Sequence, residues 1–195
     1  MTTFHKRVLT PRNLPGVTLA AARSLPTLAR AARAPTVSGK LREQVMLAVT
    51  SVNDCRYCSW AHTGLALAEG VDLDALRTLL ENGAGGVPDQ RAARAILFAQ
   101  HFADSERHPD AEARRALDET FSETERNEIL AYIHVIYLAN LSGNTVDALL
   151  ARLRGDRVEG SYLPIELVTA LLAGAPLLAI RRASQRPEQP ALAPL

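Results

Sequence analysis

Apolar residues recur three or four positions apart along most of the chain, which is the spacing of one face of an α-helix. The clearest stretch runs from residue 38 to residue 52, and its expected core positions are Leu41, Val45, Leu47 and Ala48. Alanine and leucine dominate the sequence, and no alternating stretch is long enough to predict a β-strand. The pattern therefore predicts an all-α protein.

The same spacing predicts three more helices after this stretch. Asn53 or Asp54 can cap a helix that runs to about Glu69 and stops at Gly70, and Asp72 can cap the next one. A further helix is expected to open at Pro88. Its apolar stripe consists of Ala92, Ala95, Ile96, Ala99, Phe102 and Ala103.

The second half of the chain has its own helix signals. A short charged helix is predicted over residues 110–120. Ser122 and Glu125 have the spacing of a capping box, which indicates the start of a long helix. Gly143 is expected to kink or break that helix before a last segment at Thr145–Arg154.

The two ends of the chain differ from this central region. The N-terminal part predicts an irregular arm and then a helix interrupted at Pro26. Leu163–Ile180 carries one charge, Glu166, so we expect it to be buried on the core or against a neighbouring subunit. Its prolines and Glu166 argue against a membrane span, and the last ten residues are expected to be disordered. The expected organisation is an arm and interrupted helix over 1–37, a helical domain over 38–154, and an apolar helix with a disordered tail over 155–195.

Composition narrows the function classes. The 195 residues suit one domain with short additions, and 22 basic against 21 acidic residues leave a formal net charge of +1. This balance gives no electrostatic reason to expect a nucleic acid or an anionic membrane as partner. The N-terminal region has no uninterrupted apolar stretch, so no signal peptide is predicted and a cytoplasmic location is expected.

The two cysteines of the chain form a Cys-x2-Cys motif, which predicts redox chemistry. A helix N-terminus at Cys55 would favour a thiolate there. His62 follows Cys58 by four residues, so its imidazole can lie beside that sulfur and accept a proton. Glu43 comes twelve residues before Cys55 and can reach His62 if the two helices pack antiparallel. Trp60 is either a wall of this site or a core residue.

Other interpretations of the motif remain open at this point. A cysteine pair can lack a catalytic role, and a Cys-x2-Cys-x3-His cluster can ligate zinc. A structural zinc site needs a fourth ligand, and the chain has no second cysteine pair. We therefore favour redox chemistry without a metal.

The spacing of Glu43, Cys55, Cys58 and His62 resembles the alkylhydroperoxidase D-like branch of the carboxymuconolactone decarboxylase superfamily. The resemblance extends from about Gly39 to Leu150. It implies an all-α helical bundle that forms homo-oligomers, with a dimer, trimer or hexamer expected here. It does not explain either end of the chain.

The resemblance also implies roles for individual residues. Cys58 corresponds to the cysteine that attacks a hydroperoxide, and Cys55 to the one that resolves the sulfenic acid as a disulfide. Glu43 and His62 correspond to the proton relay. Tyr57 stands where some peroxidase members have a second histidine, which makes it an accessory position. The chemistry of the helix N-terminus alone would instead favour Cys55 as the more acidic thiol.

The function expected from this resemblance is that of an antioxidant, thiol-dependent peroxidase without an organic cofactor or metal. Its expected partners are a hydroperoxide and a dithiol reductant such as a lipoyl protein or a thioredoxin-like protein. One alternative is a thiol–disulfide oxidoreductase without significant peroxidase activity. Another is a non-catalytic helical oligomer with a structural or redox-sensing cysteine pair. The decarboxylases of the superfamily act on a lactone without a Cys-x2-Cys motif, so the motif argues against that activity.

Overall fold

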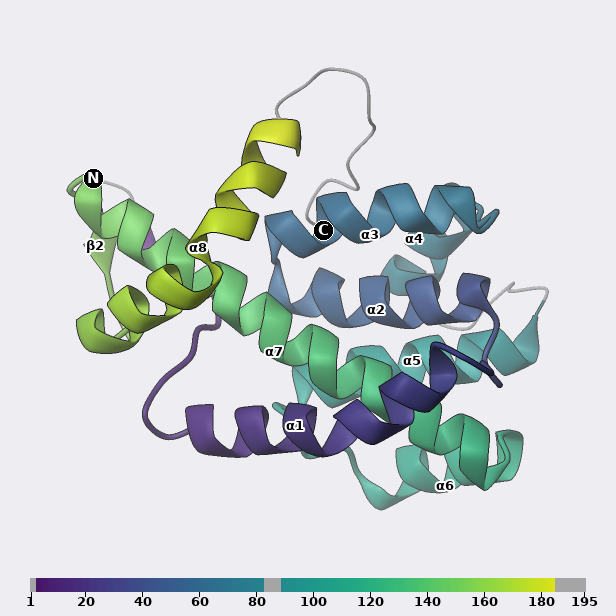
Figure 1. The fold of residues 1–195 in the computed structure, drawn as a ribbon. Coiled ribbons are helices and arrows are strands. Elements are labelled where there is room, and N and C mark those ends of the chain that lie inside the picture. Colours follow the sequence, from purple (N-terminus) through teal and green to yellow (C-terminus); the bar gives the residue numbers. More distant parts are fainter. Residues whose placement is uncertain (1–2, 83–88, 185–195) are drawn as a thin grey trace.

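The computed structural model describes residues 3–82 and 89–184, and this part of the chain forms an all-α bundle (Figure 1). Its eight helices are α1 (Leu14–Ala31), α2 (Gly39–Asn53), α3 (Arg56–Ala68), α4 (Leu73–Asn82), α5 (Gln90–Asp104), α6 (Ala111–Thr120), α7 (Glu123–Leu153) and α8 (Leu163–Ser184). Two short strands, β1 (Thr3–Phe4) and β2 (Arg157–Val158), pair in parallel. The all-α prediction is confirmed, and the predicted disordered tail lies outside the described residues.

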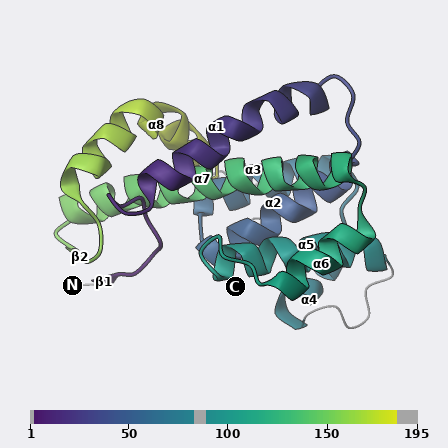
Figure 2. The ribbon, with the colours of Figure 1, turned by 90° about the horizontal axis from the view of Figure 1, so that it is seen from below.

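Helix α7 is the central element of the bundle. It crosses the molecule in Figure 1, with α1 on one side and α2 and α3 on the other, and Figure 2 shows α1 and α8 along the same helix. The predicted capping box of Ser122 and Glu125 is present at its start. The predicted kink or break at Gly143 is wrong, because α7 continues without interruption to Leu153. Packing on α1, α2 and α8 stabilises the helix through this glycine.

Helix α2 lies between α7 and α5 and carries the first residue of the predicted site. Ser38 caps it by accepting a hydrogen bond from the backbone N–H of Leu41 at 3.2 Å. All its predicted core positions are buried, and so is the predicted apolar stripe of α5. Asp89 caps α5, whereas Pro88, the predicted start, lies outside the described residues.

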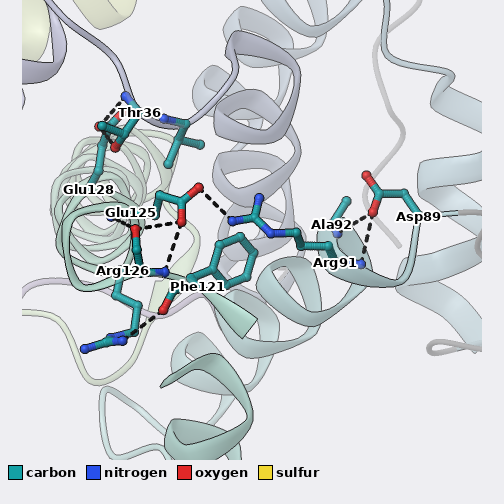
Figure 3. Close-up of polar contacts among 10 residues, drawn as sticks. Thr36, Asp89, Arg91, Ala92, Phe121, Glu125, Arg126 and Glu128 are labelled. Carbon is teal, nitrogen blue, oxygen red and sulfur yellow. Dashed lines mark hydrogen bonds and ion pairs between the residues drawn. The ribbon is translucent and has the colours of Figure 1, made fainter. Parts of the chain in front are cut away.

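A buried carboxylate on α7 fixes the entry to α2 (Figure 3). Glu128 accepts hydrogen bonds from the backbone N–H and hydroxyl of Thr36 at 2.9 and 2.6 Å. Tyr132 donates a further hydrogen bond to it at 2.9 Å. Burial raises the pKa of Glu128, but these hydrogen bonds outweigh burial and lower it below its ordinary value. The segment before α2 is therefore tied to the central helix.

A second contact in Figure 3 joins α5 to the start of α7. Arg91 pairs with Glu125 at 2.7 Å and lies over the ring of Phe121. Together with the hydrogen bonds at Asp89, this contact fixes the beginnings of two core helices.

Helix α1 corrects the prediction of an interrupted N-terminal helix. It is continuous from Leu14 to Ala31, with Pro26 inside it. Proline costs a helix interior about 3 kcal/mol, because it removes one hydrogen bond and crowds the preceding turn. Here Pro26 is exposed, while Val17, Ala21 and Ser24 are buried on the other face of the helix. Packing of that face against α7 outweighs the local cost.

Helix α8 is only partly buried within one chain, so of the two expected environments of this apolar segment the core of the same chain covers only part of it, and burial against a neighbouring subunit stays a prediction. One face points inward and includes the buried residues Glu166 and Thr169. The opposite face is apolar and exposed, with Leu171 at 84% and Leu172 at 78% of their possible exposure. The sequence could not separate the two faces, because both are apolar.

We propose that a second copy of the chain covers this exposed face of α8. Glu166 is the one charged residue between Leu163 and Ala175, and it is buried against Arg152. Two such faces can therefore meet without like-charge repulsion, and the contact removes apolar surface that monomers rarely expose.

Replacing Leu171 and Leu172 together by glutamate is expected to shift the protein to the 21.1 kDa monomer, because four charges would then meet across a two-fold contact. Light scattering measures this mass. Leu25→Glu is the control, since Leu25 is also an exposed leucine but lies on α1. A parent protein that is already monomeric would contradict the proposal.

Helix α7 is the one described helix that is long and apolar enough to cross a membrane. Of its most apolar window, 67% is buried inside the bundle, as in the core helix of a soluble protein. Leu163–Ala175 of α8 is a further apolar helical stretch.

Candidate functional site

The candidate site begins at the turn between α2 and α3. Asp54 adopts a left-handed conformation with φ of 51°, which ends α2 and reverses the chain. The predicted N-cap at Asn53 or Asp54 is wrong, because Cys55 is the N-cap residue of α3. Its Sγ accepts a hydrogen bond from the backbone N–H of Cys58 at 3.4 Å. Cys55 therefore lies at the positive end of the helix, where a thiolate is favoured.

The two sulfurs lie side by side. Cys55 Sγ and Cys58 Sγ are 2.9 Å apart, and both cysteines are free thiols. The predicted juxtaposition on one helical turn is present. Both side chains are buried, with 1% of Cys55 and 7% of Cys58 exposed. A small movement of either side chain would bring the sulfurs to bonding distance.

Glu43 and His62 also meet, as their spacing predicts. Nδ1 of His62 lies 2.7 Å from Oε2 of Glu43. Arg42 donates a hydrogen bond from Nε to the other carboxylate oxygen at 2.8 Å. Burial raises the pKa of Glu43, but the hydrogen bonds from His62 and Arg42 outweigh it and lower the pKa below its ordinary value.

This pKa direction has a consequence for the histidine. An ionised Glu43 can only accept, so Nδ1 of His62 carries the proton between them. Nε2 of a neutral His62 is then free to accept a proton from a thiol. The pair can therefore work as a base held in one orientation by a carboxylate.

The pKa of the Cys58 thiol is raised well above its ordinary value. The hydrogen bond with Cys55 is the larger cause, and burial adds to it. Cys58 therefore needs a neighbouring base to become a thiolate near neutral pH.

A cavity of about 460 Å³ opens beside the second cysteine, between α3, α7 and α8. Its walls are Tyr57, Cys58, Ala61 and His62 from α3, Val135, Ile136, Leu138, Ala139 and Ser142 from α7, and Ala173 and Leu177 from α8. Of the two cysteines, Cys58 lines this cavity. The described lining includes no lysine, arginine, aspartate or glutamate. The cavity therefore suits an uncharged, largely apolar molecule.

The two predicted accessory residues are placed differently. Tyr57 lies on the cavity wall, whereas Trp60 is not among the described lining residues. The indole N–H of Trp60 is buried without a hydrogen-bond partner in the described structure.

Asp147 is a site residue that the sequence analysis missed. It is buried on α7 and accepts short hydrogen bonds from the hydroxyl of Tyr57 and from Arg56. Burial, followed by the hydrogen bond to Asp147, raises the pKa of Tyr57 to about 12. Tyr57 therefore keeps its proton near neutral pH and fixes the turn that carries the cysteines.

A polar stripe on α7 could have revealed this contact. Asn140, Asn144 and Asp147 recur at helical spacing within an apolar helix, and all three are buried. Asn144 donates hydrogen bonds to the backbone carbonyls of Asn53 and Arg7 at 2.7 and 3.0 Å. The stripe therefore holds the end of α2 just before the cysteine turn.

Gly143 lies on the same part of α7, and its role is close packing. A Cβ atom at this position would lie 2.8 Å from Cys55 Sγ and 3.1 Å from the ring of Tyr57. The absence of a side chain at residue 143 lets α7 pack directly against the cysteine turn.

The zinc interpretation also has a geometric test. In residues 3–82 and 89–184, no three histidine, cysteine, aspartate or glutamate residues gather closely enough to hold a metal ion. The donors at the cysteine turn thus fall short of the four ligands of a structural zinc site.

Comparison with known proteins relates this site to a family. No curated protein and no solved structure matches the chain significantly. Residues 20–101 match the sequence profile described as the carboxymuconolactone decarboxylase family. This segment contains both cysteines, Glu43 and His62. This match supports the resemblance of the segment that carries the candidate site to the carboxymuconolactone decarboxylase/alkylhydroperoxidase D-like superfamily.

Proposed function

We propose that the protein is a thiol-dependent peroxidase that reduces hydroperoxides through Cys55 and Cys58. One observation carries the proposal: Cys58 lines an apolar cavity together with His62, and a second thiol lies 2.9 Å behind it. His62, which is held by its hydrogen bond to Glu43, is the base that such a buried thiol needs.

In the first step Cys58 gives its proton to Nε2 of His62, and the thiolate attacks the distal oxygen of the hydroperoxide. The O–O bond breaks as the S–O bond forms. The leaving alkoxide takes the proton from His62 and becomes an alcohol. Cys58 is oxidised by two electrons to a sulfenic acid, and the hydroperoxide is reduced by the same two electrons. Glu43 stabilises the imidazolium while it exists.

In the second step the Cys55 thiol attacks the sulfenic sulfur of Cys58. The S–S bond forms, and the hydroxyl group leaves with the Cys55 proton as water. An external dithiol, such as a lipoyl protein or a thioredoxin-like protein, then reduces the disulfide by exchange. Neither step, as proposed, uses an organic cofactor or a metal.

The choice of Cys58 as the attacking residue rests on access. Cys55, at the helix N-terminus, is better placed to hold a negative charge, whereas the pKa of Cys58 is raised. Cys58 nevertheless lines the cavity, and Cys55 is not among the described lining residues. A hydroperoxide in the cavity therefore meets Cys58 first, and His62 compensates for its high pKa.

A decarboxylase activity fits the cavity less well. A decarboxylase of this superfamily must hold a carboxylated lactone, but the described lining offers no lysine or arginine. This lining favours an uncharged oxidant. A thiol–disulfide oxidoreductase needs the same access of an external thiol to the cysteine pair as the last step of the proposed cycle, so an assay, rather than the burial of the sulfurs, distinguishes the two activities.

A steady-state assay tests the proposal. With dihydrolipoamide as reductant, the protein is expected to consume organic hydroperoxide at a saturable rate that depends on both substrates. Reduction of a small disulfide by the same dithiol is measured in parallel. Disulfide reduction without hydroperoxide consumption would overturn the proposal in favour of an oxidoreductase.

A further inference from the structure

Helix α8 forms one wall of the cavity next to Cys58. Its inward face contributes Ala173 and Leu177, opposite the α3 wall that contains Cys58 and His62. Two of the three walls, on α7 and α8, come from beyond residue 101, where the matched family segment ends. The shape of the cavity is therefore a property of this chain's own C-terminal half.

An ion pair between a partly exposed arginine and a buried glutamate anchors α8 in this position. Arg152 donates two hydrogen bonds to the carboxylate of Glu166, from Nε at 3.1 Å and from a terminal nitrogen at 2.9 Å. Glu166 is fully buried at the beginning of α8, and Arg152 lies in the last turn of α7. Burial raises the pKa of Glu166, but Arg152 outweighs it and lowers that pKa below its ordinary value. This bidentate ion pair therefore fixes the beginning of α8 against the end of α7.

With α8 held in place, the size of the side chains on its inward face determines how much of the cavity is open to a substrate. Ala173 is the small residue of the α8 wall, and Leu177 follows it by one helical turn. A cavity of about 460 Å³ holds a molecule much larger than hydrogen peroxide.

We propose that Ala173 and Leu177 determine which hydroperoxides reach Cys58, by leaving room for a bulky uncharged organic group against α8. The proposal rests on the peroxidase function above for its choice of substrate. The wall itself can be tested without that function, because thiol reagents of different size must enter the same cavity.

Ala173→Phe is the direct test, and Ala22→Phe is its control, since Ala22 is an exposed alanine on α1, a helix that contributes no described residue to the cavity. For Ala173→Phe, kcat/KM for cumene hydroperoxide is expected to fall by about tenfold or more, while kcat/KM for hydrogen peroxide changes little. Ala22→Phe should behave like the parent with both peroxides. An unchanged ratio between the two peroxides in Ala173→Phe, or an equal effect of Ala22→Phe, would overturn the proposal.

A second measurement separates failure of this proposal from failure of the peroxidase function. The rates of modification by N-phenylmaleimide and N-methylmaleimide are compared in a Cys55→Ser background. Ala173→Phe should lower the phenyl-to-methyl rate ratio, and Leu177→Ala, which only removes atoms, should raise it. If the parent shows no peroxidase activity, these ratios still decide whether α8 forms the wall. Ratios that do not change in either variant would contradict that role.

Discussion

Replacing Cys58 by serine is expected to abolish hydroperoxide turnover, with a loss of more than about 1,000-fold, because a hydroxyl cannot replace the thiolate as nucleophile. Cys55→Ser should also stop turnover, but for a different reason. In the Cys55→Ser variant, Cys58 would still react once with hydroperoxide and would then remain as a sulfenic acid, because no partner thiol is present. A single-turnover assay separates the two variants, since Cys55→Ser should consume about one equivalent of hydroperoxide and Cys58→Ser almost none.

The opposite outcome has a clear structural meaning. A single turnover in Cys58→Ser and none in Cys55→Ser would make Cys55 the nucleophile. The position of Cys55 at the N-cap of α3 would then outweigh the access of Cys58 to the cavity. Mass spectrometry after trapping of the sulfenic acid identifies the oxidised residue in each case.

Replacing Glu43 by glutamine is expected to lower the reactivity of the Cys58 thiol on the order of 100-fold near neutral pH. The amide can still hydrogen-bond to His62, but it no longer stabilises the imidazolium that forms when the thiol proton is transferred. Alkylation by iodoacetamide, followed as a function of pH in the Cys55→Ser background, measures this effect.

The pH dependence gives the sign of the effect. The pKa of Glu43 is lowered, so the carboxylate is ionised throughout the neutral range, and its support is lost only as the pH falls through that lowered pKa. In the Cys55→Ser background the hydrogen bond with the Cys55 thiol is absent, but burial still raises the pKa of Cys58, so solvent alone deprotonates this thiol only at alkaline pH. The parent and Glu43→Gln should therefore differ most near neutral pH and converge at high pH.

Glu69→Gln is the matched control for this experiment. Glu69 pairs with Arg42 at 3.3 Å, as Glu43 does at 2.8 Å, but it is more exposed and makes no described contact with His62. Equal loss of reactivity in both variants would assign the effect to Arg42 and would remove Glu43 from the proton relay.

The parts of the fold that the sequence predicts are those with local signals. Ser38, Asp72 and the capping box of Ser122 and Glu125 mark helix starts with side chains that bond to backbone groups within three residues. The cluster of Cys55, Cys58 and His62 is also local, because all three lie between the N-cap and the second turn of α3. These features depend little on the rest of the chain.

The features that the sequence analysis missed depend on contacts between distant segments. Asp147 reaches Tyr57 across 90 positions, and Gly143 has its function only because α7 packs on the cysteine turn. The N-cap at Cys55 follows from the left-handed conformation of Asp54, which its sequence neighbours do not dictate. The orientation of α8 was open as well, since a helix that is apolar on both faces gives no sign of which face is buried.

The most direct test of the central claim is a count of free thiols after the reduced protein reacts with about one equivalent of organic hydroperoxide. The account predicts that both thiols disappear together, that the mass falls by two hydrogens as Cys55 and Cys58 join, and that a dithiol restores both. Retention of both thiols while control peroxidases consume the hydroperoxide would contradict it. So would oxidation of Cys58 to a sulfinic acid with Cys55 still free, because a thiol 2.9 Å away should have formed the disulfide first.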